Sequence, residues 1–380
     1  MAPTCWHKLR GRVESPLTVE RIGMTDIKTR LISNPAVRKS LRSAARLPFK
    51  LLSASSALDY LYGSRSERVA ILCYHGVSDL PPKLGEHRYV GTAEFEQQMQ
   101  YLANKANVMP LQDLIDAIQN NEAIPPKTLA ITFDDGLAHL MQTAVPVLER
   151  FGLTATFLVV TKAVDNHEPI WTDQAQWIVE NHPPGQLEFE FEDSSFHLSF
   201  SSREERMASL TKVFKFGQSC GPDVLGGFIS RLRQTTQPAF GSMRLFENSD
   251  IEPMSWEQVK ELLSKGQSVG SHTRTHCIVS RCGPESMKDE LLNSRLRIED
   301  KIGTSCRMFA YPNGNPGNFD QTTGEILSES GYDCGLTTEF GFVTSGSQLM
   351  SLPRVGVSRS DSLGVFKAKL CGLWWNGPLS

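Results

Sequence analysis

The sequence predicts an α/β protein in which a parallel sheet or barrel is surrounded by helices. From Arg68 onward, short β-rich apolar runs alternate with one-faced helical runs, which is typical of repeated βα units. A hydrophobic content of 40% and a charged content of 21% are those of a soluble globular chain. The polar motifs described below follow predicted strands, and working groups in such folds gather at the C-terminal ends of strands.

The first βα units are predicted within residues 68–160. Strands are expected in "VAILCYHGV", "KTLAITFDDG" and "TATFLVV", and helices in "AEFEQQMQYLAN", "LQDLIDAIQN" and "MQTAVPVLERFG". In the first helix Phe95, Met99 and Leu102 recur at i, i+4 and i+7, which gives a single apolar face. Thr92 is expected to cap this helix at its N-terminus.

The alternation resumes from residue 255. A helix capped by Ser255 leads into the strand "QSVGSH", and the strand "RMFAYPNG", the helix "TGEILSESG" and the strand "YDCGLTT" follow. Residues at about 165–250 interrupt the alternation with the acidic hairpin candidate "QLEFEFEDSSFHLSF" and the helical run "SREERMASLTKVFKF". We interpret this segment as an insertion beside the site.

Residues 1–66 are interpreted as a basic N-terminal extension. Residues 1–65 carry twelve Lys or Arg against four Asp or Glu. Residues 37–63 can form a basic amphipathic helix, which would pack on the main domain or make weak contact with the surface of an anionic inner membrane. No secretion signal and no run of about 18 apolar residues is found. We therefore expect no transmembrane segment and a cytoplasmic location, with peripheral contact to the inner membrane as an extension of that hypothesis.

The charge and the cysteines exclude further classes. A formal net charge of −3 gives no broad polyanion-binding surface, so a nucleic-acid partner is not expected. The eight cysteines show no CxxC spacing and are interpreted as mostly reduced thiols of a cytosolic protein.

Two adjacent aspartates, Asp134 and Asp135, end a predicted strand. Their carboxylates repel each other, and a bound cation would offset the repulsion. His272 and His276 are four residues apart, so on a helix both imidazoles would face one metal ion. Thr273 stands where metalloproteases of this spacing carry their glutamate base. One aspartate would therefore ligate the metal and the other would act as general base, although each motif alone is often only structural.

The motifs "TFDDG", "SHTRTH" and "FAYPNG", in this order, resemble the polysaccharide deacetylase family, which is carbohydrate esterase family 4 with the NodB homology fold. The flanking "ILCYHGV" and "LPRVGV" resemble its bacterial branch with an early Tyr-His motif. The likeness covers roughly residues 68–370 without the insertion. It implies a distorted (β/α) barrel over residues 67–380, and hydrolysis that removes acetate from an N-acetylated, sometimes O-acetylated, sugar.

The resemblance assigns roles to five of these residues. Asp134 would be the general base. Asp135, His272 and His276 would hold a divalent metal, with zinc expected and cobalt or nickel as alternatives. The backbone N–H of Asn313, in "PNG", stands where the family's Pro-Tyr-Gly turn supplies its oxyanion donor.

The chain departs from the family pattern in two places. It has no histidine after His276, so by the resemblance His75 in "CYHGV" would protonate the leaving amine; the alternative is a histidine that only hydrogen-bonds near the site. The arginine that usually orients the base is replaced by Ala310. Arg354 in "LPRVGV" either substitutes for it or is structural.

The predicted substrate is a carbohydrate, in particular a precursor of a bacterial surface polysaccharide or exopolysaccharide. Trp171, Asp173 and Tyr311 are candidates for lining its groove, and a position in the core is the favoured alternative for Trp171. Two other functions stay open at this point. One is the same chemistry on a small non-sugar amide or ureide, and the other is a non-catalytic carbohydrate-binding barrel.

Overall fold

The computed structural model describes residues 68–373 except 242–244, 247–249 and 345, together with Leu58 and Tyr62. The predicted extension and its membrane contact otherwise lie outside the described residues. Leu58 and Tyr62 are buried, and the Tyr62 hydroxyl donates to the carbonyl oxygen of Lys127 at 3.1 Å. These two side chains therefore pack on the main body. None of the helices in the described part of the chain has the length and apolarity needed to cross a bilayer.

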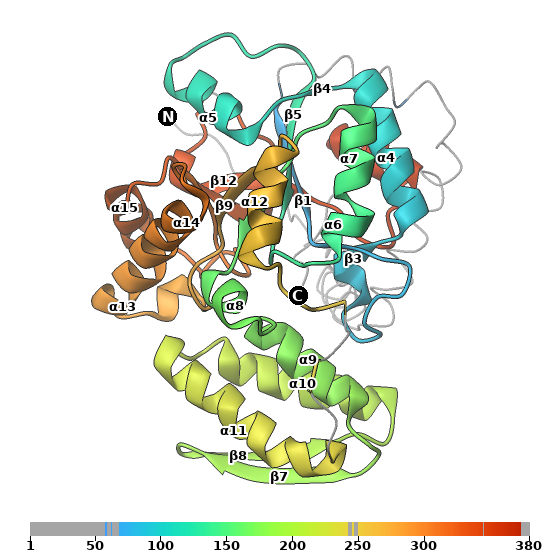
Figure 1. Ribbon diagram of the computed structural model, residues 1–380, viewed down its shortest axis with the longest axis vertical. Coiled ribbons are helices and arrows are strands. Elements are labelled where there is room, and N and C mark those ends of the chain that lie inside the picture. The colour runs from blue at the N-terminus through green and yellow to red at the C-terminus, as the bar shows by residue number, and fades with distance from the viewer. Residues whose placement is uncertain are drawn as a thin grey trace, which may run out of the picture. The chain divides into compact units, whose positions relative to one another are not determined.

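Seven parallel strands close into a barrel in the order β1-β12-β11-β10-β9-β6-β5, and β5 pairs back with β1 (Figure 1). The strands are β1 (Ala70–Tyr74), β5 (Thr128–Phe133), β6 (Thr156–Val159), β9 (Ser268–Ser271), β10 (Met308–Ala310), β11 (Cys334–Phe340) and β12 (Leu352–Gly356). The short β4 (Asn107–Val108) pairs with the beginning of β5, and β2 (Gly76–Val77) pairs with β3 (Tyr89–Val90). The predicted barrel is confirmed.

Helices cover the outside of the barrel, as repeated βα units require. They are α4 (Thr92–Lys105), α5 (Leu111–Gln119), α6 (Leu140–Thr143), α7 (Val145–Phe151), α12 (Trp256–Ser264), α13 (Pro284–Lys288), α14 (Ser294–Ile302), α15 (Gln321–Glu329) and α16 (Leu363–Leu370), with one π-helical turn at Asp289–Asn293. Two details differ from the sequence prediction. Pro146 lies in the first turn of α7, and the predicted single helix is divided into α6 and α7 just before it. Gly91, not Thr92, is the N-cap of α4.

Side-chain alternation along the strands brings polar groups to one end of the barrel interior. Residues two apart share a face of a strand, so the interior positions of β1, β5 and β12 continue from Ile71, Ala130 and Leu352, which belong to one apolar cluster. Two residues beyond them along each strand, the interior positions are Cys73, Thr132 and Arg354. The apolar cluster therefore fills the barrel below, and the strands deliver polar side chains at their C-terminal ends.

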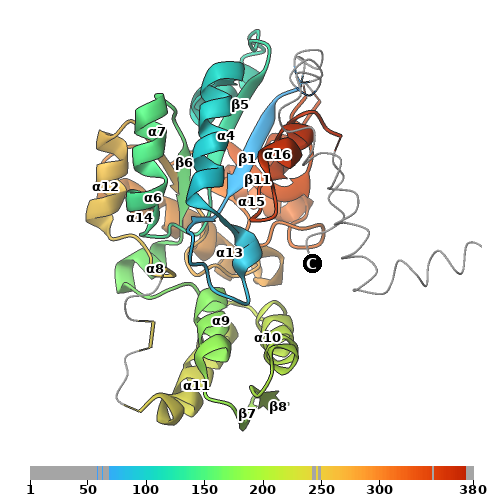
Figure 2. The same cartoon turned by 90° about the vertical axis from the view of Figure 1, so that its right-hand side faces the viewer.

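The insertion begins after β6, at the barrel end that also carries the aspartates. It consists of α8 (Thr161–Asn166), α9 (Trp171–Asn181), the hairpin β7 (Gln186–Phe191) and β8 (Ser194–Ser199), α10 (Arg203–Gly217) and α11 (Pro222–Phe240) (Figure 2). The predicted hairpin and the helix after it are both observed. Trp171, Phe196 and Phe228 belong to a second apolar cluster, to which Leu84 and Cys277 also belong, so the insertion is built around a small core next to that of the barrel.

Candidate metal centre and active site

Three metal-ligating side chains converge at the C-terminal end of the barrel. The Nε2 atoms of His272 and His276 lie 3.5 Å and 3.4 Å from Oδ1 of Asp135. All three residues are buried, and one ligand atom from each lies within 4.8 Å of the others. The residues predicted as metal ligands are thus brought together.

The donor set and its spacing fit a divalent cation. Four ligands at 2.0–2.1 Å in a tetrahedron stand roughly 3.3 Å apart, close to the two distances between the histidines and Asp135. Two imidazoles and one carboxylate are also a ligand set that catalytic zinc sites use. The buried Nδ1 of His276 has no hydrogen-bond partner among the described residues, so no protein group in that part of the chain holds this nitrogen.

A hydrogen bond fixes how His272 faces the site. Its Nδ1 lies 2.8 Å from the carbonyl oxygen of Ala310, which can only accept, so Nδ1 carries the hydrogen and Nε2 keeps its lone pair. Burial is the main cause that lowers the pKa of His272, to about 4. The imidazole is therefore neutral at physiological pH, as a metal ligand must be.

The loop that carries both histidines is not helical. Thr273 and His276 have positive φ angles of 68° and 60°, a conformation that is uncommon for residues other than glycine. The expectation that helical spacing would align the two imidazoles is therefore wrong, although the two rings do meet. A bend aligns them instead, and it is closed by a hydrogen bond of 2.8 Å from the His276 N–H to the Thr273 hydroxyl.

Glu290 anchors this bend from the π-helical turn. Its carboxylate accepts hydrogen bonds from the backbone N–H groups of Arg274 and Thr275, both at 2.9 Å, and from the Thr275 hydroxyl at 2.8 Å. Burial raises the pKa of Glu290, and the hydrogen bonds oppose that effect. The sequence analysis missed this residue, because its distance along the chain from the histidines gives no signal.

Asp134 and Arg354 form a buried bidentate ion pair. Arg354 Nη1 donates to Oδ1 of Asp134 at 2.7 Å, and Nη2 donates to Oδ2 at 2.6 Å. The guanidinium is fully buried and is itself held by the Thr337 carbonyl and the Thr132 hydroxyl. Burial raises the pKa of Asp134, but the Arg354 guanidinium, together with His272 and His75, opposes burial and brings the pKa to about 2. Asp134 is thus an oriented, ionised carboxylate.

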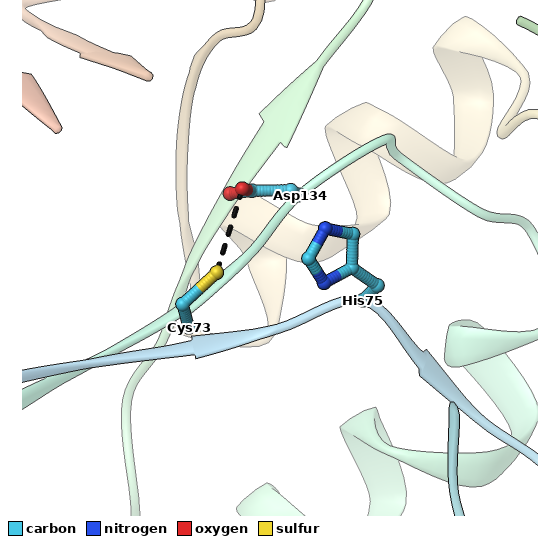
Figure 3. Close-up of side chains that lie close together, drawn as sticks. All are labelled: Cys73, His75 and Asp134. Atoms are coloured by element: carbon cyan, nitrogen blue, oxygen red, sulfur yellow. Dashed lines mark hydrogen bonds between the residues drawn. The ribbon is translucent and has the colours of Figure 1, made fainter. Parts of the chain in front are cut away.

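Cys73 and His75 lie beside Asp134 (Figure 3). The Cys73 thiol donates to Oδ2 of Asp134 at 3.5 Å, and ligand-type atoms of all three residues lie within 4.8 Å of one another. We do not assign a second metal here, because the Arg354 guanidinium already binds both oxygens of Asp134 and its charge repels a cation. Burial lowers the pKa of the partly exposed His75, and the carboxylates of Asp135 and Asp134 oppose that effect.

The predicted oxyanion donor lies in a tight turn after β10. Asn313 has a φ of 61°, a region that asparagine adopts more readily than most residues. Its carbonyl oxygen accepts a hydrogen bond from the Thr338 hydroxyl. No hydrogen bond to its N–H is found within the described part of the chain, so this N–H is available to a ligand.

The three residues predicted to line a sugar groove do not form one. Trp171, Asp173 and Tyr311 are only 5%, 0% and 1% exposed. Trp171 packs edge-on against Phe214 in the core of the insertion, and Tyr311 stacks on Phe319. A ring covered in this way offers no free face to a sugar, so the candidate groove assignment is wrong, and Trp171 is the core tryptophan that the sequence analysis favoured.

Arg88 is a site residue that the sequence analysis missed. It lies in the 3-10 turn Glu86–Arg88, and its Nη1 donates to Oδ2 of Asp135 at 3.2 Å. Its Nη2 donates to Asp173 on α9. The only available signal was a charged residue just before a short apolar run, which does not stand out from other surface arginines.

Comparison with known proteins finds a family match that contains the candidate metal ligands. The family model described as polysaccharide deacetylase matches residues 121–189 and 229–335. These two segments contain both aspartates and both histidines, and the gap between them falls within the insertion. The chain belongs to the polysaccharide deacetylase family. The family places it among hydrolases that act on carbon–nitrogen bonds other than peptide bonds.

Individual relatives of the family are distant. YxkH of Bacillus subtilis (strain 168), whose own description as a polysaccharide deacetylase is provisional, is 21% identical over 303 residues, which are 79% of this chain and 75% of YxkH. The structure of the Streptococcus pyogenes deacetylase PplD in complex with acetate has a TM-score of 0.54 at 18% identity, covering 80% of this chain and 98% of PplD. The polysaccharide deacetylase BC0361 of Bacillus cereus has a TM-score of 0.51 at 19% identity, covering 80% and 69%. At these identities the solved structures support the fold.

Proposed function

We propose that the protein is a metal-dependent hydrolase that removes the acetyl group from an N-acetylated sugar and releases acetate. One observation carries the proposal: the two adjacent aspartates have different partners. Asp135 faces two histidine nitrogens, whereas both oxygens of Asp134 are held by Arg354. One carboxylate is thus available to a cation, and its neighbour is an ionised base.

The residues would divide the reaction between them. Asp135, His272 and His276 would hold the divalent ion, which supplies Lewis-acid polarisation of a carbonyl and makes water more acidic. Asp134, kept ionised and oriented by Arg354, would accept the proton of the attacking water. The Asn313 N–H would donate to the oxygen on which negative charge develops.

Metal removal tests the first part of this proposal. Dialysis against a chelator is expected to abolish acetate release from N-acetylated sugars, and one equivalent of zinc should restore it, with cobalt and nickel as alternatives. Metal content and acetate are measured on the same preparation, with chito-oligomers, peptidoglycan fragments and lipid-linked sugars as substrates. Full activity of metal-free protein would contradict the proposal.

His75 is proposed to protonate the leaving amine. The lowered pKa makes its imidazolium a stronger acid but a less populated one at neutral pH. His75→Gln is expected to lower kcat on an N-acetyl sugar by about 10²-fold, yet to affect an activated aryl acetate ester much less, because that leaving group departs without a proton. Equal losses on both substrates would show that His75 only shapes the site. His197→Gln, an exposed position on the hairpin, is the control.

The relatives support a sugar over other substrates, since YxkH and BC0361 are both described as polysaccharide deacetylases. A small amide or ureide would use the same residues, so turnover of a ureide alone would reverse the substrate assignment. A non-catalytic binding barrel would have no use for the ionised, oriented carboxylate of Asp134. Action on a precursor in the cytoplasm, near the inner membrane, stays part of the proposal.

A further inference from the structure

Arg88 connects a metal-ligand candidate to the insertion. One nitrogen of its guanidinium contacts Oδ2 of Asp135 at 3.2 Å, and the other contacts Asp173 and, at 3.2 Å, Oε1 of Gln176. Asp135 belongs to the barrel, whereas Asp173 and Gln176 lie on α9 of the insertion. The guanidinium therefore joins the barrel to the insertion at the candidate metal centre.

The three charged side chains in this arrangement are largely or fully buried. The side chains of Asp135 and Asp173 are 2% and 0% exposed, and that of Arg88 is 18% exposed. Oδ2 of Asp173 has no hydrogen-bond partner among the described residues. A buried carboxylate is costly unless a charge compensates it, so Arg88 supplies the charge that α9 needs. Because a guanidinium is a rigid planar fork, holding it at one end also fixes the other.

The two oxygens of Asp135 consequently have separate partners. Oδ1 faces the Nε2 atoms of His272 and His276, and Oδ2 is bound to Arg88. If Arg88 were absent, both oxygens could turn toward a cation. With Arg88 in place, one oxygen is offered and the carboxylate plane is set.

We propose that Arg88 is a positioning residue which restricts Asp135 to one metal-binding oxygen, and that α9 of the insertion holds Arg88 in place for this purpose. This inference rests on the metal-dependent function proposed above. It assigns the insertion a part in the metal centre, as distinct from a groove for sugar.

A second contact from α9 agrees with this role. The Trp171 indole N–H donates to the carbonyl oxygen of His276 at 2.8 Å. The first turn of α9 thus supports two of the three ligand candidates, Asp135 through Asp173 and Arg88, and His276 through its own backbone. Partners of this kind orient metal ligands, and their loss typically changes metal affinity or activity.

The test is the visible absorption of the cobalt(II)-loaded protein, which reports the number of ligands around the ion independently of turnover. Metal-free wild type, Arg88→Met, Arg88→Lys and Asp173→Asn are each loaded with one equivalent of cobalt(II). In Arg88→Met the freed oxygen should add a ligand and weaken the absorption severalfold. Metal content should stay near one per chain, and kcat should fall about 10- to 100-fold with KM little changed. Arg88→Lys and Asp173→Asn should shift the same way by less.

Arg307→Met is the matched control. Arg307 also bridges two carboxylates, those of Asp116 and Asp333, away from the metal-ligand candidates. The cobalt spectrum and the kcat of Arg307→Met should equal those of wild type. If Arg88→Met does not fold by circular dichroism, Asp173→Asn decides, because it keeps the size of the side chain and leaves Arg88 in place.

The two ways of failing are distinct. Wild type that binds no cobalt would overturn the metal assignment and, with it, the role of Arg88. Wild type that binds cobalt, together with folded variants whose spectrum and kcat equal its own, would overturn only the role of Arg88.

Discussion

Asp134→Asn is expected to lower kcat by about 10²- to 10⁴-fold while the protein keeps its full metal content. The amide cannot take a proton from water, whereas the ligand atoms of Asp135, His272 and His276 are untouched by the change. Acetate release and metal content, measured on one preparation, check the two halves of this prediction. Loss of metal together with activity would instead make Asp134 a ligand.

The stability of this variant needs its own measurement. Asn at position 134 leaves the fully buried Arg354 without its carboxylate, so part of any loss could come from unfolding. A thermal melting curve followed by circular dichroism shows whether the variant is folded at the assay temperature and so separates the two causes. Asp116→Asn is the control, because Asp116 also pairs with an arginine, Arg307, but outside the site. A folded Asp134→Asn protein with wild-type turnover would remove Asp134 from the role of base.

Arg354→Met should lower the free energy of unfolding by about 3–5 kcal/mol, because it leaves a buried carboxylate without its counter-charge. In a chain of this size the melting temperature should fall by roughly 4–8 °C. Turnover should fall as well, since Asp134 loses both hydrogen bonds that orient it. Chemical denaturation gives the free energy, and acetate release gives the activity.

The pair can be tested by a double variant. Combining Arg354→Met with Asp134→Asn removes both charges, so the double variant should be at least as stable as Arg354→Met alone. Arg297→Met is the control for losing a guanidinium: it breaks a partly exposed pair with Asp165 and should cost no more than about 1 kcal/mol. Equal destabilisation by Arg297→Met and Arg354→Met would contradict the buried-pair account.

The repulsion between Asp134 and Asp135 is met in a way that the sequence analysis only partly foresaw. A bound cation was expected to offset it. In the structure each aspartate also has its own guanidinium, Arg354 for Asp134 and Arg88 for Asp135. Arg354 was weighed because "LPRVGV" resembles a family motif, whereas nothing in the sequence around Arg88 pointed to the site.

The predictions that failed share a physical cause. Helical spacing was the premise for aligning His272 and His276, but hydrogen bonds to Thr273 and Glu290 impose a bend instead. Trp171 was a candidate for a groove although a core position was favoured, because an aromatic residue beside a site can either stack on a sugar or fill a core. Burial decides between these two fates, and burial depends on contacts that are distant in the chain.

By itself the sequence determined the barrel, since strand and helix periods are local. It also determined which residues could ligate a metal, since two histidines and an aspartate pair carry that chemistry wherever they meet. Only the tertiary structure decided how Asp134 and Asp135 divide their partners and why α9 reaches the metal centre. Both outcomes depend on guanidinium groups from remote parts of the chain. The order of the strands places Arg354 next to Asp134, and α9 of the insertion holds Arg88 next to Asp135.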